Sequence, residues 1–484
     1  MRAILASSIG VACTASLVLP IAAASARYTA ADARPAAIEP ASGSTQSLRL
    51  ISLGAGSDRA MVPGVGLPVR EVRPFSLVGL VWDDANAELH GTVQVRTRAM
   101  DSGAWSGWQS VETHTHEDAA DPGPAERSSR PIRGGTAPLW VGASDAVEVR
   151  VRPQPAGLGR AVARDPLPEG LRLDLVDPGV EPVKDAPVKD APAGSASAEG
   201  ISAGSASAEG ISARSVPARG APADTPKASL LSPGDAASSA VNARLAPLGA
   251  TVIPAASKAR TQAELLDSWG GPGVAPGAQP ATGPFIGPRP SIITRKGWGA
   301  DETLRAQSFV YTNSVKVAFV HHTASGNDYT CAEAPSVLRS IYRYHVVSMG
   351  WRDIGYNFVV DKCGNIYEGR AGGVDEPVMG AHTFGFNSNS MGIAVLGTHS
   401  SSSPSQETVD AISELTAWKL GLHGGNPEGR ASLTSAGGKY AKGAVVKFNV
   451  ISGHKDGYAT ACPGELLYEQ LGKTRTDSAR LQGR

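Results

Sequence analysis

A tract of low complexity divides this chain of 484 residues. The sequence VKDAP occurs twice in succession over 183–192, and GSASAEGISA occurs twice over 194–213. Short polar repeats of this kind hold too little apolar bulk to stack into a core. We therefore predict a disordered, flexible linker over 180–289, with one short helix around Gln262–Trp269, between two folded parts.

Length and charge restrict the classes of protein further. A chain of this length is too long for one hydrophobic core, so two or three domains are expected. Lys and Arg together number 45, and so do Asp and Glu, which leaves a formal net charge of zero. This balance does not favour nucleic acid or an anionic membrane surface as a partner.

The first 26 residues have the pattern of a secretory signal peptide. Arg2 supplies a positive charge, Ile9–Ala24 is apolar, and Ala24-Ser25-Ala26 is a small-residue cleavage site. The alternative is a membrane anchor, but the segment is short and Pro20 interrupts it. No later segment has the apolar length of a membrane span. We expect a secreted protein, extracellular or associated with the cell wall, and a monomer.

Residues 47–179 have the pattern of an all-β, sandwich-like accessory domain. Apolar and polar residues alternate over Thr92–Arg98 and again over Val147–Arg152. Further apolar runs are separated by turns rich in Gly, Pro and Asp. Several short strands at this spacing favour a sandwich. The residues assign this domain no chemistry.

Residues 290–481 have an α/β pattern. Val315–Val320 is predicted as a buried strand that ends in two histidines, and a helix begins near Pro335. Further strands are predicted at Tyr356–Asp361, Ile366–Glu368, Met391–Leu396 and Lys447–Val450. Between the last two lies a helix with Ser403 as its predicted N-cap, ending at Gly421, and Pro463 opens a final helix.

The histidine pair could be a satisfied core pair or part of a metal site. A zinc hydrolase needs three protein ligands and one open position. His321 or His322 offers one ligand, and His454 and Cys462, eight residues apart across a Gly/Thr-containing loop, offer two more. Signal cleavage leaves three cysteines, and an odd count in an exported protein implies one disulfide and one free or metal-bound thiol. With Cys462 on the metal, the other two cysteines can pair.

Six motifs occur in an order that resembles a known family. They are Val320-His321-His322-Thr323-Ala324, Trp351–Phe358, Tyr367-Glu368-Gly369-Arg370, Gly380-Ala381-His382-Thr383, Phe386–Ile393 and Gly453-His454 through Cys462-Pro463-Gly464. The chain is similar, over about 290–481, to the peptidoglycan recognition proteins, the type 2 N-acetylmuramoyl-L-alanine amidases. The resemblance implies a mixed-sheet zinc amidase domain with flanking helices.

The resemblance also implies an activity and residues that carry it. The family hydrolyses the amide between N-acetylmuramic acid and L-alanine of the peptidoglycan stem peptide. Carried over by motif, His321, His454 and Cys462 are the Zn²⁺ ligands, Tyr356 is the catalytic tyrosine, and Thr460 is a second catalytic residue. Zinc supplies a Lewis acid for such chemistry.

Several further residues have predicted roles. Candidates for substrate binding are His345, Arg370, His382 and Asn387, although His345 also lies on an apolar helix face and His382 could serve only its own loop. A disulfide between Cys331 and Cys363 fits the exported context, and His322 is expected to orient His321. His399 and His423 are expected to be solvated in loops.

The chain departs from part of the wider superfamily at Ala394, where some members carry an acidic residue proposed as the general base. Glu368 is a fallback for that role, but a structural role is favoured. The alternative function is a peptidoglycan-binding protein that does not cut, although members of that kind typically lack the cysteine ligand. The expected partner is peptidoglycan, as muramyl peptide, and the accessory domain is a candidate for contact with cell-wall polymer.

Overall fold

The computed structural model describes residues 42–53, 64–113, 120–121, 131–154, 167–179, 231–269 and 284–484. All of them belong to one compact unit, Pro40–Arg484. The predicted signal peptide and the exact repeats lie outside the described residues. Within the described ranges, none of the helices combines the length and the apolar character needed to cross a membrane.

The N-terminal domain is an antiparallel β structure, as the alternating patterns predict. Its strands run in the order β1-β8-β3-β7-β4-β5, and β2 and β6 also pair with β3. Their bounds are Ser42–Arg49 (β1), Ile51–Leu53 (β2), Gly64–Trp82 (β3), Gly91–Ala99 (β4), Gln109–Val111 (β5), Gly134–Gly135 (β6), Leu139–Pro153 (β7) and Arg172–Gly179 (β8). Alternate residues such as Val93 and Val95 are buried in one core.

The C-terminal domain is built on a mixed sheet of seven strands in the order β17-β11-β14-β12-β13-β10-β9. The bounds are Val252–Ile253 (β9), Ile292–Ile293 (β10), Val317–His322 (β11), Phe358–Val360 (β12), Ile366–Glu368 (β13), Ser390–Val395 (β14) and Ile451–Gly453 (β17). The four neighbouring strands β17, β11, β14 and β12 are mutually parallel, with β17 at the edge of the sheet. Arg430–Thr434 (β15) and Val445–Asn449 (β16) form a separate hairpin.

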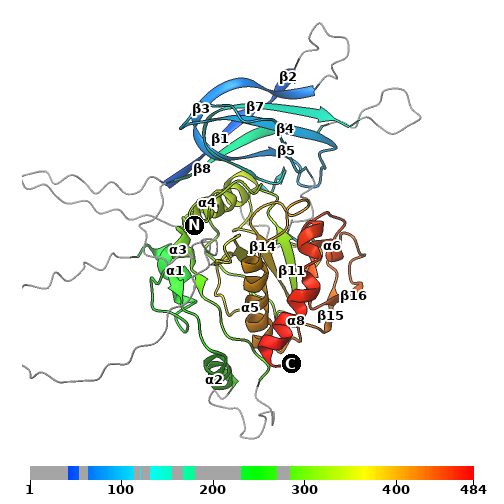
Figure 1. Cartoon of the computed structure of the whole chain (residues 1–484). Coiled ribbons are helices and arrows are strands. Elements are labelled where there is room, and N and C mark those ends of the chain that lie inside the picture. The colour runs from blue at the N-terminus through cyan, green and yellow to red at the C-terminus, as the bar shows by residue number, and fades with distance from the viewer. Residues whose placement is uncertain are drawn as a thin grey trace, which may run out of the picture. The chain divides into compact units, whose positions relative to one another are not determined.

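Helices cover both faces of this sheet (Figure 1). In β14, Ile393 contributes to the core shared with α5 (Gln406–Leu422) and α8 (Leu471–Gln482), while its neighbour Ala394 contributes to the core shared with α4 (Ala334–Arg343). Side chains one residue apart on a strand point to opposite faces, so both faces of β14 are apolar and buried. A π-helical segment, Tyr344–Ser348, continues α4, and short helices lie at Arg295–Trp298 (α3), His454–Gly457 (α6) and Glu465–Tyr468 (α7).

The predicted start of the long helix is wrong by two residues. Its N-cap is Ser405, whose hydroxyl accepts a hydrogen bond from Thr408 N at 3.1 Å, and not Ser403. Both serines precede acceptable helix-forming residues, so the local pattern does not separate them. The helix continues past Gly421 to Leu422.

Part of the predicted linker is folded. Within 180–289 the structure describes two helices, Pro233–Ala240 (α1) and Lys258–Trp269 (α2), and the edge strand β9. Ile253 and Leu265 are buried in the core that α5 and α8 also line. Helices this short are marginal on their own, so the segment gains its order by packing into the core of the C-terminal domain.

The two domains share a buried boundary. Leu77, Trp140 and Val176 of the N-terminal domain join the core around α4. The hydroxyl of Tyr344, a buried residue at the end of α4, donates to Leu80 O at 2.9 Å and lies 3.1 Å from Thr136 O. A side chain added at Gly79 would meet the Tyr344 ring at 2.5 Å. The accessory domain is therefore packed on the C-terminal domain.

Candidate functional site

Strand β11 delivers the histidine pair to the carboxyl end of the sheet. It pairs in parallel with β14 on one side and with β17 on the other, so it is central and fully buried. His321 stands opposite Ala394 in the register with β14. The next strand, β17, runs directly into α6, whose first residue is His454. Parallel strands end at the same edge of a sheet, which brings these histidines together.

Three potential metal ligands meet at this edge. One ligand atom from each of His321, His454 and Cys462 lies within 4.8 Å of the other two, and all three residues are buried. The two imidazole rings are 4.4 Å apart between centroids. The Cys462 sulfur lies 3.8 Å from His321 Nδ1 and accepts a hydrogen bond from His322 N at 3.4 Å. The structure thus gathers the predicted ligand set across 141 residues of sequence.

The chemistry of this group fits a zinc ion. Two imidazoles and one thiolate are a donor set that Zn²⁺ takes in catalytic sites, with a fourth position left for water. Burial lowers the pKa of His321 to about 3, so its imidazole is neutral near pH 7. A neutral imidazole is the form that binds a metal ion. His321, His454 and Cys462 would hold the ion.

Other aromatic and hydroxyl groups surround His321. The Tyr356 ring lies 5.5 Å from the His321 ring between centroids, and the His382 ring lies 5.2 Å from it, edge-on. Thr383 Oγ1 lies 3.5 Å from His321 Nε2. Thr460, the second predicted catalytic residue, accepts a hydrogen bond from Cys462 N at 3.0 Å. The predicted catalytic side chains therefore lie beside the ligand set.

The predicted substrate-binding residues are largely engaged within the chain. His345 is buried and accepts a hydrogen bond from Gly355 N at 3.3 Å. Its ring centroid lies 4.4 Å from that of Trp351. Arg370 Nε donates to Ile354 O at 2.8 Å. These contacts hold the loop that carries Tyr356. Roles for the two side chains in binding substrate stay predictions.

His382 and Asn387 form one structural unit. The Asn387 side-chain oxygen accepts hydrogen bonds from His382 N at 2.7 Å and from Thr383 N at 3.0 Å. His382 is fully buried, and a side chain at Gly392 would meet its ring at 2.4 Å. This unit scaffolds the loop against which His321 rests.

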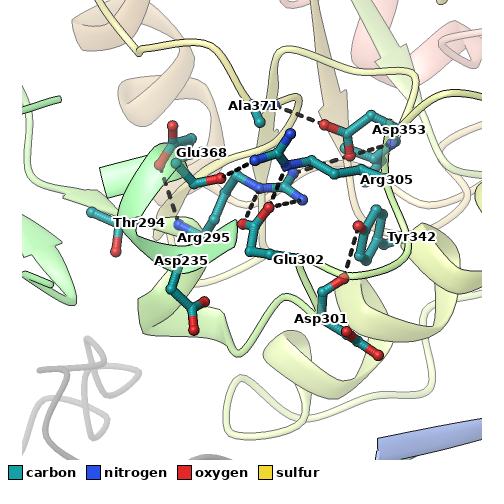
Figure 2. A network of polar contacts seen from close by, with 12 residues as sticks. Asp235, Thr294, Arg295, Asp301, Glu302, Arg305, Tyr342, Asp353, Glu368 and Ala371 are labelled. Atoms are coloured by element: carbon teal, nitrogen blue, oxygen red, sulfur yellow. Dashed lines mark hydrogen bonds and ion pairs between the residues drawn. The ribbon is translucent and has the colours of Figure 1, made fainter. Parts of the chain in front are cut away.

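A buried ionic network includes Asp353, which lies close to Tyr356 in sequence (Figure 2). Arg295 donates to Glu302 at 2.7 Å and to Asp353 at 3.1 Å, and Arg305 also donates to Glu302. The other Asp353 oxygen accepts from Ala371 N at 2.9 Å. Because Asp353 lies three residues before Tyr356, the network fixes the backbone that presents the tyrosine.

Glu368 has the structural role that the sequence favours. Its carboxylate accepts hydrogen bonds from Asn242 Nδ2 at 2.9 Å and from Arg295 N at 3.2 Å. Burial raises its pKa to about 7, against the hydrogen bonds and the positive charge of Arg295, which lower it. The side chain is fully buried in the network of Figure 2 and ties the folded part of the predicted linker to the sheet.

A disulfide joins Cys331 and Cys363, with the two Cα atoms 6.2 Å apart. This is the pairing that leaves Cys462 for the ligand set. Cys331 lies just before α4, and Cys363 lies in the turn between β12 and β13. The bond therefore connects the start of α4 to the turn between β12 and β13.

Sequence reasoning missed two groups of residues. His399 is buried, not solvated, and its backbone N donates to His322 Nδ1 at 3.1 Å. From the N-terminal domain, a Glu112 oxygen lies 3.9 Å from His322 Nε2, and Asp121 binds the Gly385–Asn387 backbone. The sequence signal that could have revealed the burial of His399 is its position just after the predicted strand that becomes β14. That strand lies beside β11 in the sheet.

Residues 311–465 match the family model described as N-acetylmuramoyl-L-alanine amidase. Residues 29–191 match the model described as Rv3811 N-terminal galactose-binding domain-like. Peptidoglycan-recognition protein SC2 of Drosophila melanogaster is 31% identical over 181 residues, which cover 37% of this chain and 84% of that protein.

The chain belongs to the peptidoglycan recognition protein family. The N-acetylmuramoyl-L-alanine amidase of Homo sapiens is 30% identical over 186 residues, 38% of this chain and 28% of that protein. Among solved structures, peptidoglycan recognition protein-LE in complex with tracheal cytotoxin is 27% identical, covers 38% of this chain and 92% of that chain, and has a TM-score of 0.31. The family and the fold class that the motifs predict are confirmed.

Proposed function

We propose that this peptidoglycan recognition protein is a zinc-dependent N-acetylmuramoyl-L-alanine amidase that cuts stem peptides from peptidoglycan. The observation that carries the proposal is the buried group of His321, His454 and Cys462 with Tyr356 beside it. The amidase family model that matches 311–465 supports the same reaction.

Each residue of the candidate site has a distinct role in the proposed reaction. Zinc, when bound, supplies a Lewis acid that polarises the scissile carbonyl and makes water acidic enough to attack near neutral pH. The Tyr356 hydroxyl donates a hydrogen bond to the carbonyl oxygen as negative charge develops on it. Thr460 accepts from Cys462 N, which leaves its own O–H to donate to the same oxygen. Thr383 and His382 hold the His321 ring in place.

The protein acts outside the cytoplasm in this proposal. The Cys331–Cys363 disulfide supports it, because such bonds persist in oxidising compartments. The predicted signal peptide agrees with the same location. The substrate there is the muramyl peptide of the cell wall.

One experiment separates cutting from binding alone. Zinc-loaded protein is incubated with purified peptidoglycan, and new L-alanine amino termini and peptide-free glycan strands are measured by mass spectrometry. Cys462→Ala is the matched control, with zinc per chain measured for both proteins. We expect termini to appear with the unaltered protein and to fall at least about a hundredfold with the variant.

A different result would favour the alternative function. If the unaltered protein binds zinc and sediments with peptidoglycan but releases no new termini, the protein recognises peptidoglycan without hydrolysing it. Several relatives are named as recognition proteins, among them the Drosophila melanogaster protein above.

A further inference from the structure

Three donors converge on one carboxylate at the edge of the candidate metal site. Gly385 N and Asn387 Nδ2 donate to the same oxygen of Asp121, at 2.6 and 3.0 Å, and Asn387 N donates to the other oxygen at 3.3 Å. Hydrogen bonds to an ionised acceptor are roughly twice as strong as bonds between neutral groups. The loop therefore presents a set of donors suited to a carboxylate.

These donors belong to the same loop as the residues that support His321. The Asn387 oxygen binds His382 N and Thr383 N, and Thr383 Oγ1 lies 3.5 Å from His321 Nε2. The donor set is thus connected to the candidate ligand set through one side chain. A ligand bound to it would lie on the same side of the sheet as the reacting bond.

The donor set is held in place by the C-terminal domain itself. Gly385 has a φ of 94°, and a Cβ atom there would meet Gly437 O at 2.2 Å. Gly385 O accepts a hydrogen bond from Ala436 N at 2.8 Å. These contacts do not involve Asp121, so they do not depend on that carboxylate.

The carboxylate that fills the set comes from the other domain. Asp121 belongs to the N-terminal domain, 264 residues before Gly385 in sequence. The candidate ligands beside it are closed off, since His321 and His454 are fully buried and Cys462 is 5% exposed.

We propose that Gly385 and Asn387 form a subsite for a carboxylate of the muramyl peptide, and that Asp121 occupies it as an internal substitute until substrate binds. The proposal rests on the proposed function and adds a substrate feature to it. An internal competitor raises the apparent dissociation constant, which equals the intrinsic constant divided by the fraction of time that the site is empty. The subsite selects peptides with a free carboxylate over peptides whose carboxylate is amidated.

The test uses the full chain with Cys462→Ala, so that no peptide is cleaved during titration. Calorimetry measures the dissociation constants of a soluble muramyl peptide ending in a carboxylate and of the same peptide ending in a carboxamide. Adding Asp121→Ala is expected to tighten binding of the carboxylate peptide at least about threefold and to leave the carboxamide peptide unchanged. Asp121→Asn, which keeps the size of the side chain but not its charge, is expected to give a smaller change of the same sign.

Asp101→Ala is the matched control. It removes an exposed carboxylate of the same domain, which accepts a hydrogen bond from the neighbouring Ser102 N. It should change neither constant, and unfolding temperatures check that each variant is folded. Equal tightening for both peptides, no change, or weaker binding in Asp121→Ala would overturn the subsite. Carboxylate-selective binding in a protein that releases no new L-alanine termini would instead overturn only the proposed hydrolysis.

Discussion

In the proposed reaction Tyr356 acts through one group, its hydroxyl. Its ring is 4% exposed and lies against His321, while its backbone oxygen accepts a hydrogen bond from Arg370 N at 2.8 Å. The ring position is therefore fixed by packing and by the backbone. Only the hydroxyl is assigned to the reaction.

Tyr356→Phe is expected to lower kcat by about a hundredfold, because removing one hydrogen-bond donor to an oxyanion costs roughly 3 kcal/mol. Zinc content and the unfolding temperature should stay unchanged, since the ring still fills its place. The assay is the release of L-alanine termini, with zinc measured in parallel. Loss of zinc together with activity would show that the tyrosine serves the metal site rather than the carbonyl oxygen.

His345 gives a prediction about pH. Burial, and then the charge of Arg370, lower its pKa to about 3, against an ordinary value of 6.5 in the unfolded chain. Between these values the unfolded state binds more protons, so the free energy of unfolding falls as the pH drops from 6.5 towards 3. Between pH 6.5 and roughly pH 4.5, the free energy of unfolding of the unaltered protein is expected to fall further than that of His345→Gln. The difference between the two falls should be about 2 kcal/mol. Urea unfolding at the two pH values measures this difference, and equal losses in both proteins would contradict it.

At the scale of elements, the network around α3 joins segments that are distant in sequence. Arg295 begins α3, Glu302 follows it in a loop, and Asp353 precedes the Tyr356 turn. Burial alone would raise the pKa of Glu302, but Arg295 and Arg305 bring it below its usual value. The carboxylate is therefore ionised and neutralises two buried arginines.

Glu302→Gln is expected to destabilise the protein by about 3 kcal/mol, because it leaves buried positive charge without its partner. Asp477→Asn is the comparison, since its partners Lys473 and Arg480 are exposed and such pairs contribute about 0.5 kcal/mol or less. Chemical denaturation of both variants measures the two losses. Similar small losses would mean that the buried network contributes little to stability.

At the scale of the whole molecule, the folded segment over 231–269 belongs to the C-terminal domain. Asn242 Oδ1 accepts a hydrogen bond from Val374 N at 2.9 Å, and Arg244 pairs with Asp375. Ile253 and Leu265 fill the core beside α5. The domain boundary therefore lies before residue 231, and the predicted boundary at residue 290 cuts through a packed layer.

A truncated chain over 231–484 is expected to be more stable than one over 290–484, because the shorter chain exposes the apolar residues that β9 and α2 cover. The difference should exceed about 3 kcal/mol, since at least two buried aliphatic side chains lose their environment. Thermal unfolding and the fraction of soluble protein measure it. Equal unfolding temperatures would show that the segment only rests on the surface.

Local patterns in the sequence were sufficient to predict many of the strands and the family of this protein. The apolar run before His321 predicts a buried strand, the alternation over Thr92–Arg98 predicts a strand of an all-β domain, and the motif order identifies the family. The cysteine count leaves one thiol over, and the disulfide leaves that thiol as Cys462. These features depend on residues that are close together in the chain or on residue identity alone.

The tertiary structure decided the contacts between distant segments. His321 and Cys462 meet because parallel strands end at one edge, and Asp121 reaches Gly385 because the N-terminal domain packs around α4. An aspartate in a polar loop carries no local signal of such a contact. The order of the segment over 231–269 likewise depends on the core in which it packs, since helices of 8 and 12 residues are marginal in water on their own.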